Sequence, residues 1–546
     1  DIRYVHYDPE AFYADTDRLC ELADAGDADG AAALYDALYD EFLYIDSLSV
    51  ITMLRHDADI YDEYWSDEYS YMNILWSEAQ DALYIACSYV LDSDIRRDFA
   101  AHIGEDTAEL LRDYVPMTEE ELAAMDRELE LLDEYYALYD TIDDVVYNYK
   151  GTDWNLDRLF GFRGDALAEK DYDGYMEVYF GIQKALCESF APIYIELAGL
   201  WREEAESAGY DDVAEYAYDY LYARDYSPED AQRFCDAVKP IARQYYADLY
   251  YSDLFYAEDY VAPVFSTQEL IDILGEYLPR IDDSLLEPWD TLTSRGLCDI
   301  QPIASGRYDG AYTTTMLYYR APFLFASLED SCYDLTTITH EFGHFCDFWF
   351  SPQTNIFTQL DDLDLSEIHS NALQALFTEF YGEIYDEGAD VAEFINLGYL
   401  LENIFDGCIY DEFQRRVLTW DGELTPEVIN DIQIQVCAEY GMYDAADREW
   451  DSTWVYISHN FEQPLYYISY AASAMAALQI WDMAQTDFDA AVDVYMDVLR
   501  WGAHTEGYFT VLQDCGLRLF TEEGAVEAVC QPVVDHLAAL DRAFAG

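Results

Sequence analysis

The sequence predicts a mainly α-helical fold that contains one small β-sheet. Through most of the chain, apolar residues recur at alternating three- and four-residue steps, which is the spacing of one buried helix face. Strand-like runs are concentrated between Gly306 and Asp334, where GAYTTTMLYYR and APFLFASLED lie between glycine and proline residues. We therefore expect a helical N-terminal half, then the sheet, then further helices.

The N-terminal half carries the clearest helix signals. Thr118 and Glu121 form a capping-box pair, and the apolar residues that follow keep helical steps as far as Tyr136. Similar patterns run through residues 11–45 and 65–92. We expect a helical N-terminal lobe over residues 1–150 and a larger helical domain, with the functional residues, over residues 151–546. A chain of this length exceeds what one hydrophobic core usually needs.

The composition excludes several classes of partner. The chain has 113 acidic and 27 basic residues and a formal charge of −86. Nucleic acids and anionic membranes require basic surface, so we expect neither as a partner. The charge agrees with attraction of basic peptides or with adaptation to high salt, and composition does not decide between them.

Cysteine usage and hydropathy point to a cytoplasmic protein. The eleven cysteines include no CxxC pair, which favours reduced thiols over a disulfide framework. No run approaches the roughly 18 consecutive apolar residues of a membrane span. The sequence begins at Asp1 rather than at methionine, so secretion of a processed form stays open.

The segment TITHEFGHFC, residues 337–346, carries the strongest chemical signal. On the helix predicted here, His340 and His344 are one turn apart and point the same way, so both imidazoles can reach one metal ion. Glu341 follows the first histidine and can contact a metal-bound water. Gly343 weakens a helix, which a purely structural helix has less reason to carry. The alternative is a pair of core histidines at this spacing.

A third ligand is expected from the next helical stretch, DLDLSEIHSNALQALFTEFY. Glu367 follows His344 by 23 residues, which allows one helix end, a loop and the first turn of a second helix. Asn371 and Gln374 share its helix face and can form hydrogen bonds to the metal-binding side chains. As one of 113 acidic residues Glu367 would carry no weight alone, but with the HEFGH helix the ligand interpretation is favoured.

At this point the sequence resembles the thimet oligopeptidase and oligoendopeptidase F family of zinc metallopeptidases. The resemblance rests on HEFGH, on EIHS about two dozen residues later, on GRYDGAYTT (Gly306–Thr314) and on WVYISHNFEQPLYYISYA (Trp454–Ala471), and it covers about residues 150–540. It implies a two-lobed helical zincin of the gluzincin type, with a deep central channel and the sheet next to the HExxH helix.

The resemblance also implies roles for individual residues. His340, His344 and Glu367 would bind one Zn²⁺, and Glu341 would act as general base. His459 would face the scissile peptide together with two tyrosines.

We assign the two tyrosines to Tyr466 and Tyr470, although Tyr467 with Tyr470 is an alternative pair. Gln374 departs from the family, which usually has a second glutamate at this position. A neutral side chain there predicts lower metal affinity or lower activity, with catalysis retained because the ligands and base are intact.

The predicted function is that of a zinc-dependent oligoendopeptidase that hydrolyses internal bonds of short peptides. The substrate backbone would pair with Phe323–Leu328 as an added strand. We expect a monomer or small homo-oligomer. The alternatives are a metallocarboxypeptidase or dipeptidyl carboxypeptidase, a catalytically silent peptide-binding protein, and a helical scaffold without metal.

Overall fold

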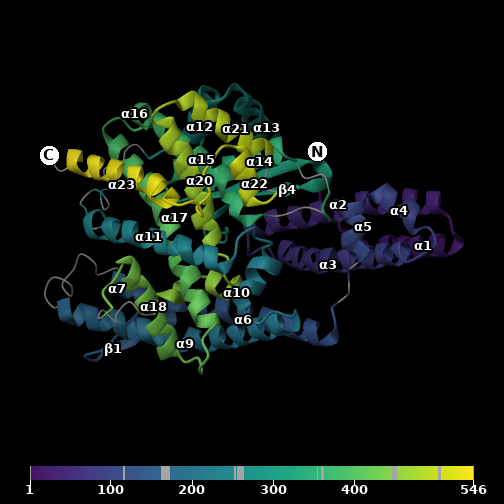
Figure 1. Cartoon of the computed structure of the whole chain (residues 1–546), viewed down its shortest axis with the longest axis horizontal. Helices are drawn as coiled ribbons and strands as arrows, with labels where there is room; N and C mark the ends of the chain where they lie inside the picture. The colour runs from purple at the N-terminus through teal and green to yellow at the C-terminus, as the bar shows by residue number, and fades with distance from the viewer. Residues whose placement is uncertain are drawn as a thin grey trace.

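The computed structural model of the chain is mainly α-helical with two small sheets (Figure 1), which confirms the predicted fold class. It describes residues 2–112, 114, 117–160, 172–250, 252, 254, 257, 264–352, 355–357, 362–445, 452–501 and 506–544. In this part of the chain, no helix combines the length and the apolar character needed to cross a membrane.

The first five helices form an arm that projects from one side of the molecule (Figure 1). They are α1 (Glu10–Ala25), α2 (Ala28–Ala58), α3 (Glu63–Leu91), α4 (Arg96–Ile103) and α5 (Glu105–Arg112). The helical pattern over residues 11–45 is divided between α1 and α2, because Gly26 adopts a left-handed φ of 71° and Asp27 caps the N-terminus of α2. The helices of the arm share one hydrophobic core, to which Met316, Ala321 and Phe357 from later in the chain also belong.

The remaining helices share a second, larger core. Figure 1 shows them as two layers, with α12, α14, α15, α20 and α21 in one, α6, α9 and α18 in the other, and α11 and α17 between. The bounds are α6 (Glu119–Asp140), α7 (Leu156–Phe160), α9 (Tyr172–Ser207), α10 (Val213–Tyr216), α11 (Pro228–Asp248), α12 (Thr267–Ile281), α13 (Leu286–Arg295), α14 (Asp334–Phe350), α15 (Leu363–Phe377), α16 (Tyr381–Ile384), α17 (Ala389–Leu418), α18 (Pro426–Tyr440), α19 (His459–Glu462), α20 (Ile468–Ala484), α21 (Phe488–Trp501), α22 (Tyr508–Asp514) and α23 (Ala525–Phe544).

Along the chain, the helices up to α5 contribute to the smaller core, and the helices from α6 onward contribute to the larger core. The smaller core contains Leu111, and the larger one contains Leu131 of α6. The predicted capping box is present, since Thr118 and Glu121 bond each other's backbone N–H at the start of α6. The lobe boundary at residue 150 stays a prediction.

The main sheet has three strands in the order β3 (Cys298–Pro302), β5 (Ala321–Leu328), β4 (Ala311–Met316), and a separate hairpin pairs β1 (Tyr147–Tyr149) with β2 (Thr152–Trp154). In the main sheet β5 is central, parallel to β3 and antiparallel to β4. The prediction that Phe323–Leu328 receives a substrate strand is therefore wrong, because this segment of β5 is already paired on both sides. Within this sheet, β4 is the edge strand beside α14.

The register shows which backbone groups of β4 face away from the sheet. The amide of Ser327 donates to the carbonyl of Gly310, and paired positions alternate along an antiparallel ladder. Thr315 lies opposite Pro322, which has no N–H to donate, as expected at a non-bonded position. The N–H and C=O groups of Ala311, Thr313 and Thr315 therefore point toward the open edge.

Candidate active site

Four of the predicted site residues lie on two helices that cross closely. Helix α14 carries His340, Glu341 and His344, and α15 carries Glu367 in its first two turns. The crossing depends on Gly343, since a Cβ there would lie 2.5 Å from both the carbonyl oxygen of His369 and the Cα of Ser370. The absence of a side chain at Gly343 thus allows the two helices to approach closely. This close approach explains why a residue that destabilises helices occurs at this position.

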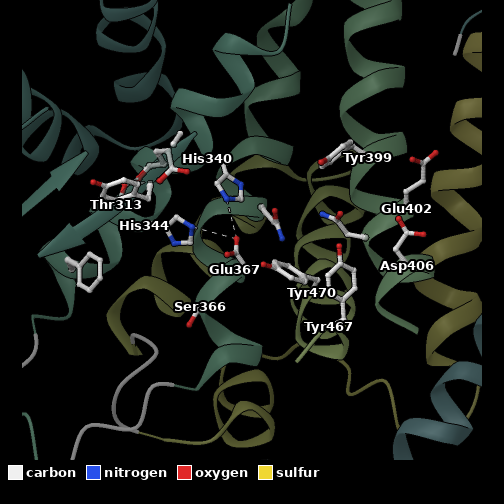
Figure 2. A pocket seen from close by; sticks show the side chains of 16 residues that line it. Thr313, His340, His344, Ser366, Glu367, Tyr399, Glu402, Asp406, Tyr467 and Tyr470 are labelled. Atoms are coloured by element: carbon white, nitrogen blue, oxygen red, sulfur yellow. Dashed lines mark hydrogen bonds and ion pairs between the residues drawn. The ribbon is translucent and has the colours of Figure 1, made fainter. Parts of the chain in front are cut away.

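The two histidines and Glu367 converge on one point (Figure 2). Glu367 Oε2 lies 3.2 Å from His340 Nε2 and 3.5 Å from His344 Nε2. One ligand atom from each residue lies within 4.8 Å of the others. Two imidazole nitrogens and one carboxylate oxygen form the donor set of catalytic zinc sites, so the residues present fit this metal.

Burial and neighbouring charges shift the pKa values of the ionisable residues at this site. Burial opposes the charged forms of both Glu367 and His344, yet their mutual attraction lowers the pKa of Glu367 well below its usual range and raises that of His344 to about 9. Burial also raises the pKa of Glu341. The site thus holds a carboxylate that stays ionised beside one with increased affinity for a proton, which suits a ligand and a general base respectively.

Glu341 is oriented by a strand residue that sequence reasoning missed. The Thr313 hydroxyl lies 2.9 Å from both the Glu341 carboxylate oxygen Oε2 and the Glu341 carbonyl oxygen. Thr313 belongs to β4, so the sheet edge and the base are fixed to each other. The run TTT gave no sign of this contact, because it depends on how α14 packs against the sheet.

The distal segment brings His459 and the tyrosines together. The ring of Tyr466 stacks on His459 at a centroid distance of 5.3 Å and an interplanar angle of 9°. Tyr470 Oη lies 3.3 Å from His459 Nε2. Burial lowers the pKa of His459, which favours the neutral ring at pH 7.

Of the tyrosines in this distal segment, Tyr467 and Tyr470 line the pocket in Figure 2, and the Tyr470 hydroxyl points toward Glu367. Tyr466 is not among the described residues that line this cavity, and its ring stacks on His459. The role of Tyr466 and Tyr470 as the substrate-facing pair stays a prediction, and this placement gives weight to Tyr467 with Tyr470.

A cavity of about 660 Å³ contains the site, and its walls come from β4, α14, α15, α17 and the segment that leads into α20. A second cavity of about 480 Å³ adjoins it and shares the lining residues Ala311, His340 and Tyr399. The concave space therefore extends to both sides of His340 along the edge of β4.

Solved structures of peptidases match this chain over nearly its whole length. Pz peptidase A, solved with an inhibitor, gives a TM-score of 0.76 at 20% sequence identity, over 99% of each chain. A protein designated an oligoendopeptidase F from Bacillus anthracis gives 0.73 at 19% identity, over 99% of this chain and 98% of that one. The chain has the oligoendopeptidase F fold.

The oligoendopeptidase F fold confirms the fold implied by the sequence resemblance. A weaker match is Trypanosoma cruzi metallocarboxypeptidase 1, with a TM-score of 0.57 at 11% identity over 95% of this chain and 99% of that one. No protein-family model matches the sequence, and no curated protein sequence does.

In this oligoendopeptidase F fold, a neutral chain of hydrogen bonds supports His340. Its Nδ1 lies 3.2 Å from Gln374 Oε1, and the Gln374 amide donates to Asn396 Oδ1. The Asn396 amide in turn donates to the Tyr381 hydroxyl over 2.9 Å. Gln374 therefore accepts from Nδ1–H, which leaves Nε2 free to bind a metal. The contact to Nδ1 is therefore made by a side chain without charge.

Replacement of Gln374 by alanine is expected to weaken metal binding by about 10- to 100-fold, the usual cost of losing such a supporting bond. Competition with a chromogenic chelator measures the affinity, and circular dichroism checks the fold. Gln80, which lies on α3 of the arm, provides a matched control as Gln80→Ala. Unchanged metal affinity in Gln374→Ala would contradict the supporting role.

Arg224, which no sequence pattern distinguishes, joins α15 to the tyrosine segment of the fold. Its guanidinium lies 3.6 Å from Asp364 of α15 and donates to the Leu465 carbonyl over 3.0 Å and to the Ser469 hydroxyl over 2.9 Å. Leu465 has a φ of 63°, a strained value for a branched side chain. Arg224 thus stabilises an unfavourable backbone bend just before Tyr466.

Proposed function

We propose that the protein is a zinc-dependent endopeptidase that hydrolyses internal bonds of short peptides. The observation that carries the proposal is the convergence of His340, His344 and Glu367 in a cavity, with Glu341 beside them. This arrangement suits metal-assisted hydrolysis. The peptidases that share the fold support the proposal.

In the proposed mechanism, His340, His344 and Glu367 would hold one Zn²⁺. Bound there, the metal would supply Lewis-acid polarisation and would lower the pKa of water, so that a nucleophile forms more readily near neutral pH. Glu341 takes the proton of the attacking water and passes it to the leaving amine. Thr313 keeps the Glu341 carboxylate in place through its hydroxyl.

In this proposal the hydroxyl of Tyr470, which lies 3.3 Å from His459 Nε2, would donate to the oxyanion that develops on the substrate carbonyl. The substrate backbone would add to β4 through the outward-facing groups of Ala311 and Thr313, rather than to β5 as the sequence had suggested. An extended peptide in this position crosses directly in front of Glu341.

Two observations favour cleavage of internal bonds over removal of C-terminal residues. The two adjoining cavities leave room for substrate on both sides of His340. A carboxypeptidase needs a cation to bind the terminal carboxylate, and no arginine or lysine is among the described residues that line either cavity. Acidic side chains in the lining, such as Asp309 and Glu329, would repel that carboxylate.

A doubly blocked peptide, acetylated at one end and amidated at the other, tests the proposal. We expect internal cleavage, loss of activity after dialysis against a chelator, and recovery with added zinc. Mass spectrometry identifies the products, and elemental analysis counts the metal. Cleavage of only the unblocked peptide would support the carboxypeptidase alternative, and bound metal without turnover would support a silent peptide-binding protein.

The remaining parts of the proposal concern the setting of the enzyme. We propose short peptides as the partners, a monomer or small homo-oligomer as the assembly, and the cytoplasm as the location, on the composition given above.

A further inference from the structure

His340, His344 and Glu367 are called the metal-ligand group here. The wall of the cavity opposite this group contains two carboxylates that the proposed mechanism does not use. Glu402 and Asp406 lie one turn apart on α17, and both line the cavity that holds His340, His344 and Glu367. Figure 2 shows them together across the pocket from α14. Side chains four residues apart on a helix face the same way, so both can contact one ligand group.

Neither carboxylate has a cation as a partner among the residues that the structure describes. Glu402 Oε1 accepts a hydrogen bond of 2.5 Å from the Tyr245 hydroxyl, and no described side chain donates a hydrogen bond to Asp406. Burial raises the pKa of both groups to about 7, and for Asp406 the neighbouring Glu402 adds to the effect. The structure therefore leaves the attraction of this pair for a positive charge unsatisfied.

Two other acids on the same helix are paired with cations. On the next two turns of α17, Asp411 lies 2.7 Å from Arg415, and Glu412 lies 3.0 Å from Lys239. Those acids face the core, where an unpaired charge is costly. Glu402 and Asp406, which have no cation partner among the described residues, instead line the cavity that holds the metal-ligand group, where a substrate can supply the charge.

We propose that Glu402 and Asp406 form the side-chain pocket that selects peptides with a basic residue, arginine before lysine. The inference rests on the proposed peptidase function, since the site itself is defined by the metal-ligand group and its cavity. A guanidinium suits the pair because it can donate to both carboxylates at once. The rings of Tyr399 and Tyr467, which line the same cavity, offer faces for the cation.

Binding tests the inference separately from catalysis. The Glu341→Gln variant is titrated calorimetrically with two blocked peptides that differ only by arginine or norleucine at one central position, with the position varied in turn. We expect the arginine peptide to bind about 10- to 100-fold more tightly at one position, which corresponds to about one charge-assisted hydrogen bond. Equal affinity at every position overturns the inference, whatever the activity of the enzyme.

Specificity in the active protein gives the second test. The ratio of kcat/KM for the arginine peptide to that for the norleucine peptide is measured for wild type and for Glu402→Gln/Asp406→Asn, and the cleavage sites are mapped. We expect the ratio to fall toward one in the double variant. The matched control is Asp17→Asn/Glu21→Gln, an exposed acid pair with the same spacing on α1 of the arm, which should keep the wild-type ratio.

The outcomes separate the two proposals. If no peptide is hydrolysed but the arginine peptide binds preferentially, the proposed peptidase function is wrong and the proposed pocket is supported. If hydrolysis shows no preference for arginine, or if the double variant keeps the preference, the pocket is wrong and the peptidase function stands. A preference seen only with an unblocked N-terminus would mean that the pair binds the terminal amine, which also overturns the inference.

Discussion

Replacement of Glu341 by glutamine is expected to lower kcat/KM for a blocked peptide by about 10²- to 10⁴-fold, the range usual for loss of a general base. Glutamine keeps the shape of the side chain and can still accept a hydrogen bond from the Thr313 hydroxyl, which lies 2.9 Å from the carboxylate oxygen in the wild type. It cannot take a proton from water. The measurement is steady-state hydrolysis of a quenched fluorescent peptide with zinc added.

The metal content of this variant provides the control. Glu341 is not among the residues that converge on the metal position, so Glu341→Gln should bind zinc with the wild-type stoichiometry. Loss of activity together with loss of metal would mean that the substitution has disturbed the site as a whole. Activity close to wild type, with metal bound, would remove Glu341 from the role of base.

Replacement of Gly343 by alanine is expected to destabilise the protein and to weaken the metal site. The new Cβ would lie 2.5 Å from backbone atoms of His369 and Ser370, which cannot rotate away, so α15 must shift. Overpacking of this kind costs about 1–3 kcal/mol in the free energy of unfolding. A shift near 1 Å would move Glu367 away from the histidines and lower kcat/KM by about 10²-fold.

Gly199 supplies the matched control, because it lies inside helix α9 and nothing stands within 4 Å of the position of its Cβ. Gly199→Ala should therefore stabilise the protein by up to about 1 kcal/mol through helix propensity alone. Thermal unfolding and chelator competition compare the two variants. Equal stability and metal affinity in both would show that the close crossing does not position the ligands.

Much of the site could be predicted from the sequence because its key spacings are local. The four-residue spacing of His340 and His344 fixes their relation on a helix, whatever the rest of the fold. Glu367 follows after one loop, a spacing that favours it as the third ligand, and the family resemblance implies the same role. The convergence of these three residues now supports that part of the prediction.

What the sequence could not predict depends on packing between distant segments. The apolar run Phe323–Leu328 identified a strand correctly, but its apolar character reflects a central position in the sheet, and the substrate edge belongs to β4. Strand β3, with the sequence CDIQP, is too short and polar to show a pattern. Glu402 and Asp406 are two of 113 acidic residues, and only the cavity distinguishes them.

The edge strand has a further consequence for the behaviour of the protein in a crowded solution. An unpaired edge invites pairing with any other exposed strand, and is therefore a common origin of aggregation. In this molecule the open edge of β4 faces a cavity walled by α14, α15 and α17, which a folded sheet cannot enter. The recess that admits a single extended peptide thus also protects the protein from associating with itself or its neighbours through that edge.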